Sequence, residues 1–167
     1  MQPVLPHELR PFEAPDLDAL LALYGQAVRS QCTGLYTPRQ VDAWANHGQH
    51  NAIVAETIQR GTTLVNPVHP GHSAMAAFAV LDPLDRLALL YCDGRYSRQG
   101  RSSSLLAALE AHARAQGVHQ LRTEASQLSQ PLLLRLGWHI EAPETVIFAG
   151  ERFERWRMIK PLTPGHG

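Results

Sequence analysis

The sequence predicts a single α/β domain over residues 1–160, in which a mixed β-sheet carries helices on both faces. A length of 167 residues, 44% hydrophobic and 18% charged, suits one globular domain with its own core. The apolar periodicity changes along the chain in the order strand, helices, three strands, helix, strand, helix and two strands. A meander of strands followed by strand–helix–strand implies a mixed sheet.

The N-terminal part is predicted to hold one short strand and three helices. Residues 7–12 (HELRPF) have the pattern of a strand, and Asp16 is a suitable N-cap for the next helix. The apolar face of that helix comprises Leu17, Leu20, Leu21, Tyr24 and Val28. Residues 37–40 (TPRQ) combine a threonine cap, a proline at the first helical position and the glutamine of a capping box. A third helix is predicted over 52–60, ended by Gly61.

Three strands and a helix are predicted next. Residues 62–65 and 73–81 read as strands joined by a Pro/Gly/His turn, and residues 85–92 (DRLALLYC) as a third strand. Gly117 stands where a left-handed C-terminal cap would end the following helix. One stripe of that helix is apolar and comprises Leu105, Leu106, Leu109 and Ala113.

The C-terminal part is predicted to contain a strand, a short helix and a hairpin. Residues 119–126 (HQLRTEAS) form the strand and 129–137 the helix. The segment 144–160 forms a hairpin that turns at Ala149-Gly150. The tail 161–167 (PLTPGHG) is predicted to be disordered.

Charge and cysteine content restrict the partners and the compartment. The formal net charge is zero, which argues against a nucleic-acid surface or an anionic membrane as the main partner. No run approaches a membrane span, and the N-terminal MQPVLPHELR lacks the regions of a signal peptide. Cys32 and Cys92 imply no disulfide framework, so we expect a cytoplasmic protein.

The loop SRQGRSSS at 97–104 has features of an anion site. A helix that begins directly after a strand presents free N–H groups and the positive end of its dipole, and Gly100 lets a ligand approach the main chain. The alternative is a solvated connection with a serine cap and surface arginines. The loop lacks the glycines of a Walker or dinucleotide motif. The residues assigned to the anion are Arg98, Gln99, Gly100, Arg101, Ser102 and Ser103.

Strand, loop and helix together resemble the acetyl-CoA-binding motif of the GNAT superfamily of N-acetyltransferases. LYC at 90–92, DGRY at 93–96, SRQGRS at 97–102 and the Leu-Leu pair at 105–106 follow one another as in that family. LRTEAS, PLLLRLGWHI and RWRMIKPL extend the resemblance toward the C-terminus. With ELRPFEAPDLDALLALY at the front, it covers nearly the whole chain.

The resemblance implies a fold and a co-substrate. The fold is a mostly antiparallel sheet of six to seven strands that splays apart between the fourth and fifth strands. Acetyl-CoA would lay its pantetheine arm in that opening, against main chain at Leu90, Tyr91 and Cys92, and its pyrophosphate on the Gly100 loop. Ser126, at the end of the fifth strand, would also contact it, and no metal is implied.

Three positions depart from the family pattern. Ser97 replaces the usual Gln or Arg, and Ser102 replaces a Gly or Ala where the phosphate packs closely. Leu133 stands where the family often places a tyrosine that protonates the departing thiolate. Because a thiol has a pKa near ~8.5, the CoA sulfur can still leave without that acid.

The acceptor amine must lose a proton before it attacks, and Glu124 is the candidate base by its position on the fifth strand. The alternative is an ion pair between Glu124 and Arg122 on the same strand face. Tyr91 is the candidate acid or proton relay, with core packing as the alternative. A strand amide near Cys92 would stabilise the oxyanion.

Other chemically suggestive residues have simpler explanations. Cys92 lies where the thioester would be, but a buried cysteine is usually inert. Two His-x-x-His pairs, at 47–50 and 69–72, fall in predicted loops without a third ligand, so no metal site is expected. Tyr24, Tyr36 and Trp44 either pack in the core or line an apolar or aromatic acceptor pocket.

The sequence therefore predicts an N-acetyltransferase that moves an acetyl group from acetyl-CoA to a primary amine of a small molecule or peptide, by direct attack in a ternary complex. The alternative is a degenerate GNAT domain that binds acyl-CoA or a protein without catalysis. Because GNAT domains commonly dimerise, the resemblance favours a homodimer.

Overall fold

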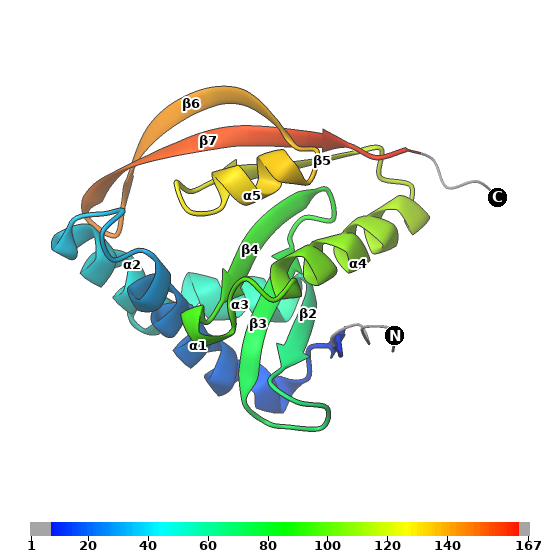
Figure 1. Cartoon of the computed structure of the whole chain (residues 1–167), viewed down its shortest axis with the longest axis horizontal. Helices are drawn as coiled ribbons and strands as arrows, with labels where there is room; N and C mark the ends of the chain where they lie inside the picture. The colour runs from blue at the N-terminus through cyan, green and yellow to red at the C-terminus, as the bar shows by residue number, and fades with distance from the viewer. Residues whose placement is uncertain (1–7, 164–167) are drawn as a thin grey trace.

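The computed structural model describes residues 8–163 as one seven-stranded sheet with helices on both faces (Figure 1). The strand order is β1-β2-β3-β4-β5-β7-β6, and each neighbouring pair is antiparallel except β4–β5. This confirms the predicted mixed, mostly antiparallel sheet. The strands are β1 (Arg10–Pro11), β2 (Thr62–Pro67), β3 (Met75–Leu81), β4 (Arg86–Cys92), β5 (Gln120–Ala125), β6 (His139–Phe148) and β7 (Glu151–Pro161).

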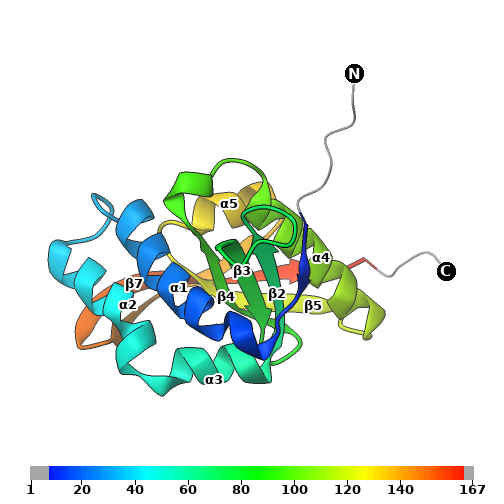
Figure 2. The same cartoon turned by 90° about the horizontal axis from the view of Figure 1, so that it is seen from below.

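The helices lie against the sheet (Figure 2). Two of the apolar clusters join helices to the sheet. One cluster joins α4 and α5 to the sheet, and the other joins α1 and α3 to the opposite face, while α2 packs beside α1 and contacts β7. Within residues 8–163, no helix is both long and apolar enough to cross a membrane. The helices are α1 (Leu17–Gln31), α2 (Pro38–His50), α3 (Ala52–Arg60), α4 (Arg101–Ala115) and α5 (Gln130–Arg135), with 3₁₀ turns at Ala14–Asp16 and Gly94–Tyr96.

The predicted helix and turn signals have the expected geometry. Thr37 Oγ1 accepts the Gln40 N–H at 3.2 Å, and Gln40 Oε1 accepts the Thr37 N–H at 2.9 Å, which completes the capping box of α2. Gly117 adopts φ +88° just after α4. Ala149 and Gly150 both have positive φ in the β6–β7 turn, as a tight hairpin turn requires.

Two predicted boundaries need correction. Asp16 does precede α1, but its carboxylate accepts bonds from Arg10 and the Glu13 N–H, each at 2.8 Å, so it caps the preceding 3₁₀ turn instead. At the other end, Pro161 belongs to β7 and Leu162 is buried in the α4–α5 cluster, because its N–H bonds the His119 carbonyl. The described structure thus includes Pro161, Leu162 and Thr163 of the predicted tail, whereas residues 1–7 and 164–167 lie outside the described residues.

The sheet opens between β4 and β5, as predicted. These strands pair only at Arg86–Arg122 and Leu87–Thr123. The Thr123 hydroxyl donates to the Leu87 carbonyl at 2.6 Å at this junction. Directly afterwards, Ala88 has no paired residue on β3. This residue forms a β-bulge, which bends β4. Beyond it, the β4 edge toward β5 has no strand partner in the described part of the chain.

Candidate active site

The N-terminus of α4 is open and uncapped. Arg98 and Gly100 have φ values of +60° and +79°, and the Gly100 carbonyl accepts the Ser104 N–H at 2.9 Å. Gly100 occupies the N-cap position, where no side chain caps the helix. A Cβ at Gly100 would meet nothing within 4 Å, so the space in front of the helix is free. The first N–H groups of α4 and the dipole therefore face an accessible concavity that suits an anion.

The arginines of this loop do not all face the anion site. Arg95 pairs with the buried Asp93 at 2.8 Å. Arg101, for which the sequence predicts a charge at the anion site, lines the cleft, and its guanidinium also bonds the side-chain oxygen of the buried Asn66 at 2.7 Å. Arg101 therefore anchors the start of α4 to the end of β2. Arg98 is exposed, and among residues 8–163 no ion pair holds it.

A cleft of about 700 Å³ runs from this loop into the gap between β4 and β5. Its size lies within the range of small-molecule and cofactor sites. Gln99 does not line it, and its side chain accepts a bond from Arg101 at 3.3 Å. The predicted residues that line the cleft are Leu90, Tyr91, Cys92, Arg98, Gly100, Arg101, Ser102, Ser103, Glu124 and Ser126.

Two buried thiols line the cleft, Cys92 at the end of β4 and Cys32 directly after α1. Burial raises the pKa of Cys92 to about 11, and that of Cys32 likewise to about 11. Both therefore stay protonated near neutral pH, which disfavours a nucleophilic role. Gln31, which sequence reasoning missed, donates its side-chain amide to the Cys92 carbonyl and so fixes the end of β4. No sequence pattern marked this contact.

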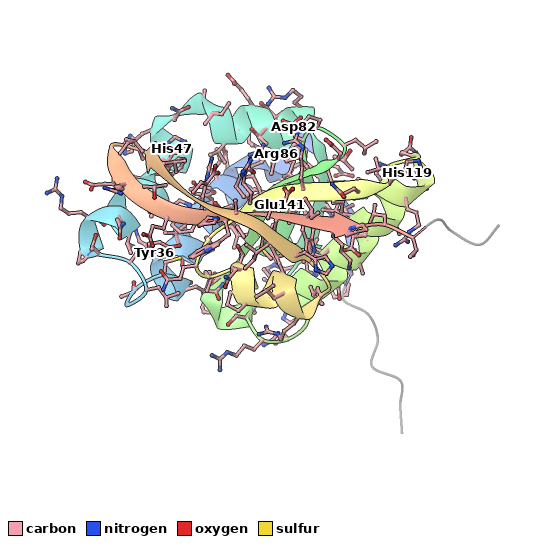
Figure 3. All side chains as sticks on the ribbon, turned by 90° about the horizontal axis from the view of Figure 1, so that it is seen from above. Tyr36, His47, Asp82, Arg86, His119 and Glu141 are labelled. Carbon is pink, nitrogen blue, oxygen red and sulfur yellow. The ribbon has the colours of Figure 1, made fainter. Side chains whose placement is uncertain are left out.

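A second cavity of about 330 Å³ lies toward α2, α3 and the β6–β7 hairpin. Tyr36 and His47 mark its hairpin end, and Asp82 and Arg86 its other end (Figure 3). His47 lies in α2 rather than in the predicted loop. Among the residues described, no cluster of three His, Cys, Asp or Glu side chains is arranged for a metal. The side chains that border both cavities are Trp44, Ala88, Leu89, Tyr91, Glu124 and Ser126.

Glu124 forms an ion pair with Arg86, not with Arg122, the partner that the sequence suggested. Its carboxylate accepts Arg86 Nε at 3.0 Å, whereas Arg122 pairs with Asp85 at 3.3 Å. The parallel register explains this exchange, because it sets Arg86 directly opposite Arg122. Two arginines repel each other, so each binds a carboxylate of the other strand or its preceding turn. Glu124 remains 23% exposed at the boundary of the two cavities.

Tyr91 both packs and faces the site. Its ring stacks on Phe78 with centroids 5.8 Å apart, and its hydroxyl accepts Trp44 Nε1 at 3.1 Å. Burial raises the pKa of Tyr91 to about 12, so the phenol keeps its proton at neutral pH and can donate it. The predicted anchored hydroxyl is present on a residue that borders both cavities.

The polar side chains at the end of β5 form hydrogen bonds within the protein. Ser126 and Ser129 exchange main-chain and hydroxyl bonds at about 3 Å, so the Ser126 hydroxyl already has a partner. The Tyr36 hydroxyl accepts the Gln127 N–H at 2.8 Å.

The cleft wall is apolar at Leu133, where the family often has a phenol. Leu133 is 1% exposed and lines the cleft.

Comparisons with known proteins agree with this geometry. The model of the acetyltransferase (GNAT) domain family matches residues 32–159. A GCN5-related N-acetyltransferase from Rhodopseudomonas palustris aligns with a TM-score of 0.89 at 25% identity, over 97% of this chain and 99% of its own. The PaiA N-acetyltransferase of Thermoplasma acidophilum, solved with coenzyme A, gives 0.73 at 17% identity, over 92% and 98%.

A further solved structure carries the acetylated co-substrate. A GNAT phosphinothricin acetyltransferase from Sinorhizobium meliloti, in complex with AcCoA, gives a TM-score of 0.65 at 18% identity, over 98% of this chain and 95% of its own. No curated protein sequence matches significantly.

Proposed function

This chain belongs to the GNAT family of acetyltransferases, and we propose that it transfers an acetyl group from acetyl-CoA to a primary amine by direct attack in a ternary complex. One observation carries the proposal. Two neighbouring cavities at the parted strands share Tyr91 and Glu124 in their linings. One has an open helix N-terminus for a diphosphate, and the other has room for an acceptor.

The binding of acetyl-CoA is supported by the cleft and by the related structures. The unpaired edge of β4 offers main-chain groups to the amides of a pantetheine arm, and the amides after Gly100 suit a pyrophosphate. Two fold relatives were solved with coenzyme A or AcCoA. Arg98 supplies an exposed cation that lines the cleft at the same loop.

The reaction then removes two protons from the ammonium nitrogen and returns one to the departing sulfur. Fewer than about one alkylamine in a thousand is unprotonated at neutral pH, so Glu124 takes the ammonium proton directly or through water. The free nitrogen attacks the thioester carbon, and the C–S bond breaks as the C–N bond forms. The CoA thiolate leaves and takes a proton from Tyr91 or from solvent. The attacking nitrogen loses its second proton to the Tyr91 phenolate or to solvent, which leaves a neutral amide. An amide of the β4 edge stabilises the developing oxyanion.

The proposal is tested by calorimetric titration with acetyl-CoA and by release of free thiol in the presence of amines. Glu124→Gln keeps the shape and the bond to Arg86 but removes the base. We expect kcat to fall about 100-fold, with acetyl-CoA affinity unchanged. Glu141→Gln, on the exposed face of β6 (Figure 3), is the matched control and should leave kcat unchanged.

A non-catalytic acyl-CoA module is the second candidate, because Leu133 removes the usual acid from the cleft wall. Acetyl-CoA binding without turnover across an amine panel would support this module. No binding at millimolar acetyl-CoA would overturn both functions.

A further inference from the structure

The smaller cavity has an aromatic wall built from four parts of the chain. Tyr36 precedes α2, Trp44 lies in α2, Phe148 in β6 and Phe153 in β7. Ring centroids lie 5.5 Å apart for Tyr36–Trp44, 6.0 Å for Trp44–Phe153 and 5.8 Å for Phe148–Phe153. Tyr36, Trp44 and Phe148 remain half-buried at the cavity, unlike the core ring of Phe78, which is 0% exposed. Tyr36, Trp44 and Phe148 therefore pack on one side and leave part of each ring open to a ligand in the cavity.

The rest of the lining is electrically balanced. Its charged side chains are Arg60, Arg86, Arg155, Asp82, Glu124 and Glu154, three of each sign. Arg60 pairs with Asp82 at 2.7 Å and Arg86 with Glu124 at 3.0 Å. The His47 ring lies 4.4 Å from Phe148, and burial lowers the pKa of His47, which favours its neutral form. A balanced lining suits an acceptor with a single positive charge and disfavours a polycation.

The size and the layout of the cavity restrict the acceptor further. A volume of about 330 Å³ lies at the low end for small-molecule sites, which suits one ring with a short chain. The aromatic wall lies toward the hairpin, whereas Glu124 lies at the boundary with the acetyl-CoA cleft. A ring placed on the wall would direct an amine on a short chain toward Glu124. An aliphatic amine could still pack on the rings, but it would lack the additional ring–ring interaction that an aromatic amine forms.

We propose that the acceptor is an arylalkylamine, a primary amine on a short chain that ends in one aromatic ring. The proposal rests on the acetyltransferase function above and names its substrate class. The ring packs against Trp44, Phe148 and Phe153, and the ammonium group lies against the Glu124 carboxylate.

The test compares phenethylamine and tryptamine with hexylamine, spermidine and alanine in the thiol-release assay. We expect kcat/KM to be at least about tenfold higher for the two arylalkylamines. Phe148→Ala removes a ring that borders only the acceptor cavity. It should raise KM for phenethylamine about tenfold and leave acetyl-CoA affinity unchanged. Ile147→Ala, one residue away and 74% exposed, is the matched control and should change neither value.

Each other outcome has a defined meaning. Equal or higher kcat/KM for hexylamine, spermidine or alanine overturns the arylalkylamine class and leaves the acetyltransferase function intact. An unchanged KM in Phe148→Ala also overturns it. Acetyl-CoA binding with no acetylation of any amine overturns the proposed function, and the acceptor class with it.

Discussion

Cys92 illustrates how burial decides the chemistry of a single side chain. Its thiol lines the cleft that we propose binds acetyl-CoA, where a thiolate could accept the acetyl group, but burial raises its pKa to about 11. Only about one thiol in a thousand is then ionised at about pH 8, too few for an efficient nucleophile. At the residue scale, the structure therefore favours direct transfer to the amine.

We predict that Cys32 and Cys92 react slowly with iodoacetamide near neutral pH and about tenfold faster for each further pH unit up to their pKa of about 11. Because both pKa values are raised on folding, the unfolded chain loses these protons first. Their contribution to stability is therefore complete below about pH 8.5 and is lost as pH rises toward 11.

Mass spectrometry measures the alkylation of both cysteines. It also detects any acetyl group that acetyl-CoA alone leaves on Cys92. Such an acetyl group would contradict direct transfer.

At the scale of one element, the two glycines that flank α4 allow the anion site to be tested. Gly100 and Gly117 flank this helix with φ values of +79° and +88°, and a Cβ at either would meet nothing within 4 Å. An alanine at either position has the same left-handed strain, about 1 kcal/mol. The two glycines differ in position, because Gly100 lies at the N-terminus of α4 and Gly117 just after its C-terminus.

We predict that Gly100→Ala and Gly117→Ala lower the melting temperature by similar amounts, about 2–4 °C. Only Gly100→Ala should weaken acetyl-CoA binding, by about tenfold, because it shifts the amides that face the cleft. Thermal unfolding and calorimetric titration measure the two effects. Equal acetyl-CoA affinity in both variants would mean that the helix N-terminus does not hold the ligand.

The same scale separates what the sequence could predict from what it could not. The capping box at Thr37, the cap at Gly117 and the hairpin turn depend on neighbours within a few residues, and all three were found. The partners of Glu124 and Arg101 lie 38 and 35 residues away. They depend on how β4 meets β5 and how α4 meets β2, which no local pattern specifies. Phe148 and Phe153 were missed for the same reason.

For the whole molecule, the parted strands divide one sheet into two halves that share little main-chain pairing. Only two residue pairs connect β4 to β5, and Ala88 bends β4 away directly afterwards. A pantetheine arm in this gap would act as a missing strand, because its amides can bond the unpaired β4 edge. Ligand binding would therefore complete the sheet as well as fill a cleft.

We predict that saturating acetyl-CoA slows hydrogen exchange at least about tenfold at those amides of residues 88–92 that do not bond β3. The amides of β2 and β3, which already pair along their length, should change much less and serve as the internal control. Mass spectrometry or NMR with and without acetyl-CoA measures both. If Gly100→Ala weakens binding but residues 88–92 gain no protection, the pyrophosphate binds the loop while the arm lies outside the gap. The meeting point at Glu124 and Tyr91 would then not be the reaction centre.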